Sequence, residues 1–393
     1  METKTSIGII GAGPAGLFLA LLLHQAGIDC VILENRSREY IENRTRAGLL
    51  EQNTVDLMEE LTVADRLHRD GLRHHGVNLS FEGCRVRVPF DELTGGRCIT
   101  IYGQQEVIRD LVKAAMERDI PILFEAMATA ILEAETTEPR IQYTQNGKDH
   151  SLTCDFIAGC DGYHGISRKA MPAGSYSEFV KDYPFSWLGI LAHARPATEE
   201  LIYSYHEHGF ALYSLRSQVV SRLYLQVSND ENPEEWDDQR IWDELDCRLS
   251  DNHGFKVNRG EIFEKAITPM RSFMIDHMQW GRLFIAGDAA HIVPPTGGKG
   301  LNLAVADIRI LANGFTAWYR KNQEVDLKNY SQEALKRIWR AQDFSNFMTY
   351  IFHKQAERGS FDYHLQKARF DYIRQSRAMA TTLAENYVGL KIC

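Results

Sequence analysis

A glycine-rich segment near the start of the chain constrains the fold more than any other feature. The sequence Gly11-Ala-Gly13-Pro-Ala-Gly16 follows an apolar run at 6–10 and precedes a stretch with helical periodicity at 14–26. A second apolar run occupies 30–33. This order predicts a strand, a helix and a second strand parallel to the first. The three glycines suit a tight turn, a close approach of phosphate to the backbone, and close packing of the helix.

The residues around this segment favour dinucleotide binding over a plain glycine-rich turn. Glu34 ends the second strand, where an acidic side chain can accept hydrogen bonds from ribose hydroxyls. The free N–H groups at the start of the helix favour phosphate. The segment alone does not distinguish FAD from NAD.

Bulk properties exclude several classes of protein. With 393 residues, 44% of them hydrophobic, we expect two or three domains with a sizeable core. The net charge of −9 argues against general nucleic-acid binding. No apolar run reaches the length of about 18 residues that spans a membrane, and the first residues lack a signal-peptide pattern. Seven cysteines without a CxxC pair indicate reduced thiols in a cytoplasm.

The rest of the chain changes character twice. Asn146-Gly147 lies between two apolar runs and predicts a hairpin. From about 178 to 275, several runs alternate between apolar and polar residues, which predicts an antiparallel sheet. After Pro294-Pro295 the apolar residues follow helical spacing, so we expect mostly helices from 301 to 393.

Two later motifs resemble those of the FAD-dependent aromatic hydroxylases. Gly159-Cys-Asp161-Gly162 is similar to their Asp-Gly motif, and Gly287-Asp288-Ala-Ala-His is similar to their Gly-Asp motif. The order and spacing of all three motifs match that family. The resemblance implies bound FAD and an α/β fold. It implies a Rossmann-like FAD-binding domain over 1–177, completed by 268–300, an antiparallel-sheet substrate domain over 178–267, and a helical C-terminal region over 301–393.

The resemblance also implies which residues contact the cofactors. Around FAD we expect Gly11, Gly13, Gly16, Glu34, Arg44, Arg46, Gln104, Asp161, Arg222, Asp288, Lys299, Gly300, Leu301 and Asn302. The chain has one GxGxxG site, which agrees with a family whose reduced nicotinamide binds without a domain of its own. For the nicotinamide we expect Asn35, Arg36, Tyr40, Arg44, His164 and Arg271. Strictly NADPH-dependent relatives carry arginine at the position of Asn35, so this residue leaves NADH open as the alternative. Arg36, Arg38 and Tyr40 can still meet the 2′-phosphate, so we expect NADPH use.

Strand periodicity gathers polar side chains in the middle region. Ser214 and Arg216 share one face of a strand, and Arg222 and Tyr224 share a face of the next run. The residues between Arg216 and Arg222 are few enough for a hairpin loop. An arginine fork matches a carboxylate, but the pattern alone leaves a solvent-facing cluster equally open.

The family resemblance decides for a substrate site. It implies that 4-hydroxybenzoate is hydroxylated at the 3-position by O2, with Ser214, Arg216 and Tyr224 holding the carboxylate. Tyr203 is implied at the phenol oxygen, with Tyr387 next in line. The carbonyl of Pro295 is implied beside the ring, His74 as the proton port to solvent, and the assembly as a homodimer. A histidine titrates near neutral pH, unlike a tyrosine, which suits the outer position. Without the resemblance, His74 beside His75 is typical of an exposed loop.

Three alternatives remain open at this point. A related hydroxylase could act on another phenol, such as 3-hydroxybenzoate. An NAD-dependent dehydrogenase would not need Gly287-Asp288 and would be colourless, and a non-enzymatic dinucleotide-fold protein would not oxidise NAD(P)H. No metal site is expected, because His206-Glu-His208 is better interpreted as a polar hairpin tip.

Overall fold

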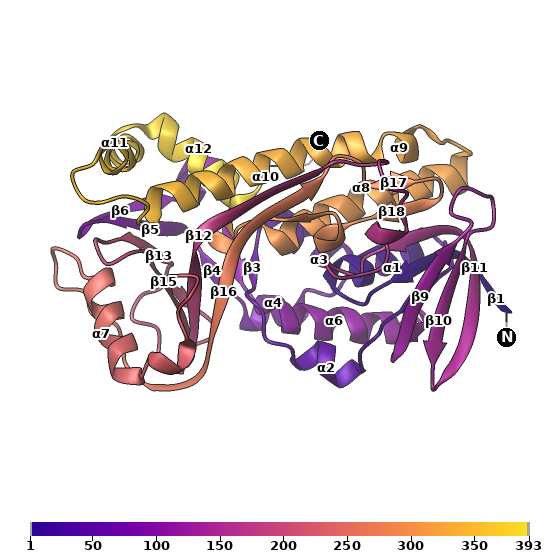
Figure 1. Ribbon diagram of the computed structural model, residues 1–393, viewed down its shortest axis with the longest axis horizontal. Helices are drawn as coiled ribbons and strands as arrows, with labels where there is room; N and C mark the ends of the chain where they lie inside the picture. Colours follow the sequence, from indigo (N-terminus) through magenta and orange to yellow (C-terminus); the bar gives the residue numbers. More distant parts are fainter. Residues whose placement is uncertain (1, 391–393) are drawn as a thin grey trace.

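The structure is a computed structural model that describes residues 2–390. Cys393, one of the seven cysteines, lies outside the described residues. Figure 1 shows one sheet on the right, a second sheet on the left, and two long strands, β12 (Glu178–His193) and β16 (Glu261–Ile275), running between them. Helix α10 (Tyr330–Phe352) lies along both halves. The long strands therefore connect the region of the glycine-rich segment to the antiparallel region.

The predicted strand, helix and strand at the start of the chain are confirmed. They are β1 (Glu2–Ile10), α1 (Pro14–Gln25) and β2 (Cys30–Leu33), and β1 pairs with β2 in parallel. Leu17 to Leu23 of α1 are all buried, because the helix lies under α6 (Gln104–Glu117) and α8 (Gly300–Lys321) as well as against the sheet. A helix that is apolar all round is the expected sequence for such a position.

The first sheet has eight strands with β1 near its centre. Its path is β17 (Gln279–Trp280), β18 (Leu283–Ile285), β11 (Lys148–Gly159), β1, β2 and β8 (Ile122–Leu123), and β10 (Arg140–Gln145) joins β11 to β9 (Ala126–Leu132). The hairpin predicted at Asn146-Gly147 is confirmed, with Gln145 opposite Lys148. Both turn residues have positive φ, 53° and 70°, as a two-residue hairpin turn of this type requires.

The second sheet confirms the predicted antiparallel region and extends it. Its order is β19 (His291–Ile292), β16, β12, β15 (Ser221–Val227), β14 (Ala211–Leu215), β13 (Ile202–Tyr205), β5 (Gly76–Phe81) and β6 (Cys84–Pro89). Strand β5 pairs with β13 in parallel, and the other pairs are antiparallel. Because β5 and β6 come from 76–89, the sheet draws on two separate parts of the chain. The domain boundaries stay a prediction.

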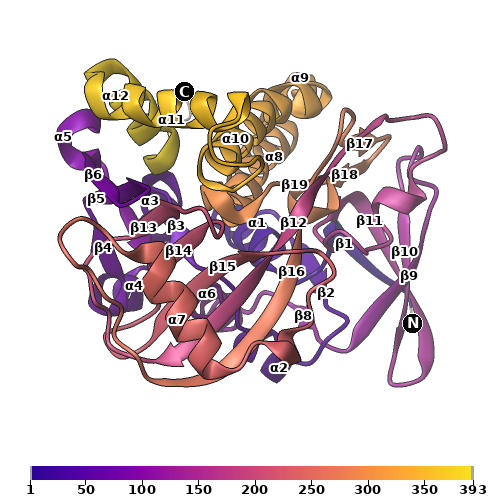
Figure 2. The same ribbon diagram turned by 60° about the vertical axis from the view of Figure 1, so that its left-hand side comes forward.

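Short elements fill the space between the sheets, and helices cover their faces. A small third sheet contains β3 (Leu49–Leu50), β7 (Ile99–Ile101) and β4 (Leu72–His74). The remaining helices before residue 300 are α2 (Arg38–Asn43), α3 (Gln52–Glu60), α4 (Asp65–Asp70), α5 (Phe90–Thr94) and α7 (Asp238–Leu249). Figure 2 shows α7 lying across the outer face of the second sheet.

The helical region predicted after Pro295 is confirmed. It contains α8, α9 (Val325–Lys328), α10, α11 (Phe361–Gln375) and α12 (Arg377–Val388). None of the helices within residues 2–390 is long and apolar enough to cross a bilayer. The six described cysteines are free thiols. A cytoplasmic location stays a prediction.

A buried histidine joins α10 to the second sheet. The indole Nε1–H of Trp187 donates to His353 Nε2 at 2.6 Å, and His353 Nδ1 donates to the Thr349 carbonyl at 3.0 Å. The imidazole stacks between the rings of Phe185 and Phe210, with centroid distances of 4.5 and 4.3 Å. Burial lowers the pKa of His353 from 6.5 to about 3, so the ring is held neutral.

This histidine predicts a loss of stability in acid. The unfolded chain takes up a proton near pH 6.5 and the folded chain only near pH 3, so stability falls as the pH drops between these values. The slope from one such group is at most about 1.4 kcal/mol per pH unit. Urea unfolding at several pH values gives the unfolding free energy as a function of pH. Between pH 6.5 and 3 this free energy should fall less steeply with decreasing pH for His353→Gln than for the wild type. An identical slope would contradict the assignment.

Candidate active site

The three glycine-containing motifs meet at the carboxyl end of the first sheet. Gly11 has φ of +102°, and a Cβ there would lie 2.4 Å from the carbonyl oxygen of Cys160, the residue before Asp161. A Cβ on Gly287 would lie 3.6 Å from the Cβ of Ala15. Strands β1, β11 and β18 are parallel, so their carboxyl ends lie side by side at the edge where open α/β sheets bind ligands.

The glycine-rich turn has the shape of a phosphate cradle. A Cβ on Gly16 would lie 2.0 Å from the Gly11 carbonyl oxygen, so only glycine allows α1 to pack this closely. Gly13 instead faces open space, with no atom within 4 Å of a built Cβ. Gly13 is also the N-cap of α1 and carries no side-chain cap. These residues fit the pyrophosphate of a dinucleotide, whose charge the helix N-terminus stabilises.

Glu34 is fixed beside this turn. Its Oε2 atom accepts from the Ala12 amide and its Oε1 atom from the Arg36 amide, both at 2.8 Å. The side chain is buried. Each carboxylate oxygen keeps a second lone pair that a ribose hydroxyl can use. The position agrees with the expected role.

The Asp-Gly motif is tied to the Gly-Asp motif by an arginine. Asp161 Oδ2 accepts from the amide and hydroxyl of Ser167, both at 2.9 Å, while burial raises the pKa of this carboxyl group. Its Oδ1 atom is buried and has no hydrogen-bond partner among the described residues. Arg168 donates to the Ala289 carbonyl at 2.8 Å and to the Tyr163 carbonyl at 3.0 Å. This link places the two motifs relative to each other.

A buried ion pair that sequence reasoning missed holds the Gly-Asp motif. Asp307 on α8 accepts from the Gly287 amide at 3.0 Å and lies 2.5 Å from Nε2 of His291. Although burial alone would lower it, the Asp307 carboxylate holds the pKa of His291 above its usual value. Asp288 itself is exposed at this turn. The only sequence signal for Asp307 was an acid within the apolar stripe of a helix.

The loop before α8 is anchored by a second buried ion pair. Lys299 donates to Glu51 at 2.7 Å and to the Tyr387 carbonyl at 3.0 Å. Asn302 donates to the Leu49 and Gly298 carbonyls, both at 2.9 Å. Although burial alone would raise the pKa of Glu51, Lys299 and its neighbour Arg337 hold it below the usual value. Sequence reasoning missed Glu51 and Arg337.

Several predicted cofactor residues take positions at the ends of elements. Gln104 is the first residue of α6, while Gly300 and Leu301 open α8. Helix α8 has Lys299 as its N-cap without a side-chain cap, so its first N–H groups are available to an anionic group. The Arg46 carbonyl accepts from Arg216 at 2.8 Å, which joins a predicted cofactor residue to a predicted substrate residue.

The predicted polar face of the second sheet is confirmed by its register. Ser214 lies opposite Arg222, and Leu212 lies opposite Tyr224. Arg216 closes the hairpin through its amide, which donates to the Val220 carbonyl at 3.0 Å. The alternate side chains of β15 face the apolar core under α7: Leu223, Leu225 and Val227.

Two arginines converge on this face. The Arg216 guanidinium donates to Gln105 and to the Arg46 carbonyl, and neither Arg216 nor Arg222 pairs with a carboxylate among the described residues. Burial, together with the charge of Arg222, lowers the pKa of Arg216 to about 10. The NH1 atom of Arg222 is buried without a hydrogen-bond partner in the described chain. Such a pair of partly buried cations is suited to an anion.

Two buried tyrosine hydroxyls lie at the other end of the site. The Tyr203 hydroxyl donates to the Thr296 carbonyl at 2.8 Å and lies 2.6 Å from the Tyr387 hydroxyl. Burial raises the pKa of both phenols, so both stay neutral. Thr296 directly follows Pro295, so this pair lies beside the residue expected next to the ring.

His74 is buried rather than exposed, so the exposed-loop interpretation is wrong. It lies on β4 opposite Ile99 and is 1% exposed, and burial lowers its pKa to about 4. Neither ring nitrogen has a hydrogen-bond partner within the described part of the chain. The structure does not connect it directly to either tyrosine, and its role as the proton port stays a prediction.

The predicted nicotinamide residues form two groups. Arg36 and Arg44 lie over the ring of Tyr40, at 5.2 and 5.9 Å from its centroid. His164 and Arg271 both contact Tyr163, and Arg271 also pairs with Asp182 at 2.9 Å. Asn35 directly precedes Arg36 and is exposed.

Comparisons with known sequences match nearly the whole chain. A model of the family described as FAD binding domain matches residues 4–345. The chain is 45% identical over 391 residues to p-hydroxybenzoate hydroxylase from Acinetobacter baylyi, which covers 99% of this chain and 96% of that relative. It is 24% identical over 408 residues to 3-amino-4-hydroxybenzoate 2-monooxygenase from Streptomyces cremeus, with 97% and 93% covered.

Solved structures show the same fold. The p-nitrophenol 4-monooxygenase from Pseudomonas putida superimposes with a TM-score of 0.83 at 17% identity, with 100% of each chain covered. A ternary complex of aklavinone-11 hydroxylase with FAD and aklavinone has a TM-score of 0.74 at 18% identity, with 91% of this chain and 72% of that chain covered. The predicted α/β fold class with a Rossmann-like unit is confirmed.

Two glycine variants should separate cofactor binding from folding. Gly13→Ala fills the open space of the cradle, so FAD affinity should fall at least about tenfold, which is 1.4 kcal/mol, while the fold is kept. Gly16→Ala forces a Cβ against the Gly11 carbonyl and should lower the unfolding free energy by about 1–3 kcal/mol. Flavin content after gel filtration and melting of the apoprotein measure both effects. The reverse pattern would refute this geometry.

Proposed function

Because this chain belongs to the family of FAD-dependent aromatic hydroxylases, we propose that it hydroxylates 4-hydroxybenzoate at the 3-position, consuming O2 and a reduced nicotinamide. The product is 3,4-dihydroxybenzoate. The choice of substrate rests on the polar groups at the two opposite ends of the site. Two arginines without a carboxylate partner in the described chain lie at one end, and the Tyr203–Tyr387 pair lies at the other.

The arginine end supports an acid group on the substrate. Arg216 and Arg222 are partly desolvated, and a benzoate carboxylate would supply the negative charge that both lack. Ser214 lies directly opposite Arg222 and adds a hydroxyl donor. Tyr224 and Tyr203 both lie opposite Leu212, two register positions from the Ser214–Arg222 pair. A single aromatic ring with groups at opposite positions fits this arrangement.

The tyrosine end supports activation of a phenol. Tyr203 donates to the Thr296 carbonyl, so the Tyr387 hydroxyl donates to Tyr203. If Tyr203 turns from Thr296 to the substrate oxygen, the pair can carry the phenol proton away from the ring. For this transfer both hydroxyls reverse, so that the substrate donates to Tyr203 and Tyr203 donates to Tyr387 as each hydroxyl passes its own proton on. Because burial raises the pKa of both phenols, neither holds the negative charge, and both hydroxyls are neutral after the transfer. His74 is proposed as the outer proton port, reached through water. Because burial lowers its pKa to about 4, water must enter beside the ring for it to accept the proton.

When FAD is bound, it accepts hydride from the reduced nicotinamide and activates O2. The residues that would hold it are those of the cradle, Glu34, Asp288 and the loop from Lys299 to Asn302. The N-terminus of α8 favours negative charge on a reduced cofactor placed beside it. Arg222 lies opposite Ser214 and its buried NH1 atom has no hydrogen-bond partner in the described chain, and we propose that it couples cofactor movement to substrate binding.

NADPH is the proposed reductant, with NADH as the alternative. Arg36, Arg44 and Tyr40 form a cationic group around one ring, which suits the extra phosphate of NADPH. His164 and Arg271 are proposed to contact the same ligand from the second group.

A homodimer is the proposed assembly. Phe361, Leu365 and Tyr372 lie on one face of α11 and are 77%, 37% and 58% exposed. A large apolar stripe of this kind is typical of a protein interface. Light scattering of the purified protein measures the assembly directly.

The decisive experiment joins spectrum, turnover and product. The purified protein should be yellow, and 4-hydroxybenzoate should stimulate oxidation of NADPH with formation of 3,4-dihydroxybenzoate. The same assay with NADH ranks the two reductants. Parallel assays with 3-hydroxybenzoate test the related-hydroxylase alternative. A colourless protein, or NADPH oxidation without a catechol product from any phenol, would overturn the proposal.

Arg216→Ala should weaken binding of 4-hydroxybenzoate. A hydrogen bond to a charged group contributes about 1.5–3 kcal/mol, so the dissociation constant should rise about 10- to 150-fold. Flavin absorbance changes on titration with the substrate measure it. The exposed Arg195, in the loop after β12, provides the control variant Arg195→Ala, which should bind as the wild type does. Unchanged affinity in Arg216→Ala would place the carboxylate elsewhere.

Tyr203→Phe should slow product formation while leaving substrate binding mostly intact. The phenylalanine keeps the ring but breaks the hydroxyl chain, and loss of a positioned proton-transfer group costs about 10²-fold or more in rate. Single-turnover product yield and the substrate dissociation constant separate the two effects. Tyr205→Phe, in the same strand, is the control. Full yield at the normal rate in Tyr203→Phe would remove this residue from phenol activation.

A further inference from the structure

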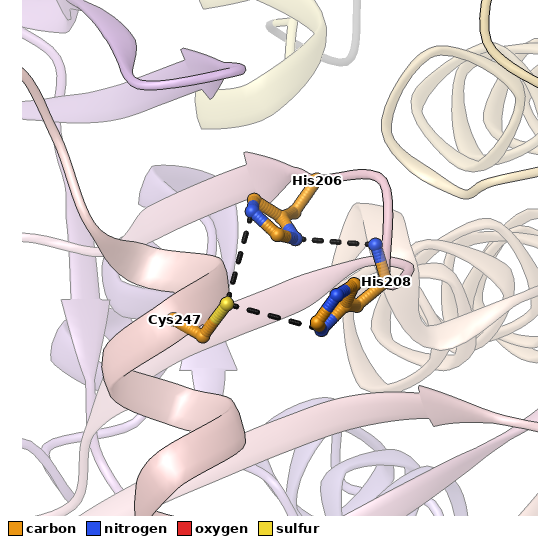
Figure 3. A group of neighbouring side chains, drawn as sticks. All are labelled: His206, His208 and Cys247. Carbon is orange, nitrogen blue, oxygen red and sulfur yellow. Dashed lines mark hydrogen bonds between the residues drawn. The ribbon is translucent and has the colours of Figure 1, made fainter.

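Three side chains with metal-binding atoms lie together outside the active site. His206 and His208 come from the loop between β13 and β14, and Cys247 comes from α7 (Figure 3). The sequence alone favoured a polar hairpin tip at these histidines, and the tip is confirmed, since Gly209 donates to the His206 carbonyl at 2.9 Å. Cys247 is the third group, and only the packing of α7 on this hairpin brings it there.

We propose that His206, His208 and Cys247 bind one divalent zinc ion. The Cys247 Sγ atom lies 3.9 Å from His206 Nε2 and 3.8 Å from His208 Nδ1, and the three atoms lie within 4.8 Å of one another. With Zn–S of about 2.3 Å and Zn–N of about 2.0–2.1 Å, tetrahedral ligand atoms are about 3.4–3.6 Å apart. The Cys247–His distances therefore need to close by about 0.3 Å, and the separation of the two histidine nitrogens by at most about 1.4 Å.

The ligand types select the metal. One thiolate and two imidazoles suit zinc and other borderline or soft ions, whereas magnesium and calcium require oxygen ligands. Among residues 2–390 this is the one group of three or more His, Cys, Asp or Glu side chains with ligand atoms this close together.

A carboxylate stands beside the open fourth position. Glu244 is one helical turn before Cys247, and its Oε1 atom is 3.4 Å from His208 Nδ1. Its Oε2 atom is held by Arg248 Nε at 2.7 Å, which fixes the orientation of the group. His208 and Glu244 also line a surface cleft of about 300 Å³, which gives the ion a path from solvent. The fourth ligand is Glu244 or a water in this cleft.

Binding requires two local changes. The Cys247 thiol releases its proton to solvent when it ligates. His206 Nδ1 accepts from the His208 amide at 3.1 Å, so in the metal-free protein the ring proton is on Nε2, which faces the sulfur. For Nε2 to ligate, the proton must move to Nδ1 and the ring must turn away from the His208 amide. The hairpin loop should therefore shift on binding.

The site would join two elements that flank the active site. His206 is three residues after Tyr203 on the same hairpin, and β14 carries Ser214. A metal at the loop would hold this hairpin to α7 and stabilise the folded state, because binding to the folded form alone shifts the unfolding equilibrium. This inference is independent of the proposed substrate.

The test uses the flavin-loaded protein after treatment with a chelator and gel filtration. Zinc titration followed by calorimetry, with elemental analysis of the zinc-loaded protein, should show one zinc per chain. The zinc-loaded protein should also have a higher melting temperature than the metal-free protein. Cobalt in place of zinc should give the intense visible bands of a tetrahedral cobalt–thiolate site in the red, beyond the absorbance of oxidised flavin. These readouts do not depend on turnover.

Matched variants decide the ligands. Cys247→Ser and His206→Asn should each weaken zinc binding at least as much as loss of an outer-shell partner does, about 10- to 100-fold, and should abolish the cobalt–thiolate bands or shift them. Cys84→Ser, which alters another partly buried thiol, and His253→Asn, which alters an exposed histidine, should bind as the wild type does. Absence of stoichiometric zinc in the wild type, or unchanged binding in Cys247→Ser, would overturn the proposal.

Discussion

Close backbone contact at the glycine-rich turn determines how the rest of the active site is arranged. Gly11 and Gly16 approach the backbone so closely that any side chain would collide, at 2.4 Å from the Cys160 carbonyl oxygen and 2.0 Å from the Gly11 carbonyl oxygen. These contacts hold the glycine-rich turn against the Asp-Gly motif and against the start of α1. Gly13, left open by the same geometry, becomes the surface on which a pyrophosphate can lie. A dinucleotide site follows from packing that only glycine permits.

Buried charges fix the remaining walls of the site. Asp307 holds the Gly-Asp turn through the Gly287 amide and His291, and Glu51 holds Lys299 at the start of α8. Each pair is almost fully removed from water, so loss of one partner would leave an uncompensated charge. The Arg216 and Arg222 pair differs from these because its charge is unmatched by any carboxylate in the described chain. That imbalance is what a substrate carboxylate would correct.

Alternate side chains of the second sheet face the hydrophobic core on one side and the candidate site on the other. Along β15, the side chains at 223, 225 and 227 enter the core under α7, while Arg222 and Tyr224 face the site. The same sheet carries Tyr203 on β13, so both ends of the proposed substrate would be held by the consecutive strands β13, β14 and β15. Strands give the rigid spacing that a small aromatic ring requires.

The sequence by itself determined the elements and the faces of this protein. Turn residues, glycine spacing and period-two alternation are local properties, so the first strand–helix–strand unit, the hairpins and the polar face of Arg222 and Tyr224 could be predicted. Only the tertiary structure decided which distant groups meet. Asp307 reaches Gly287, β5 joins β13, His74 is buried, and Cys247 lies beside His206 and His208 because helices and sheets pack them there. Side-chain contacts between residues far apart in the chain leave no periodic trace in the sequence.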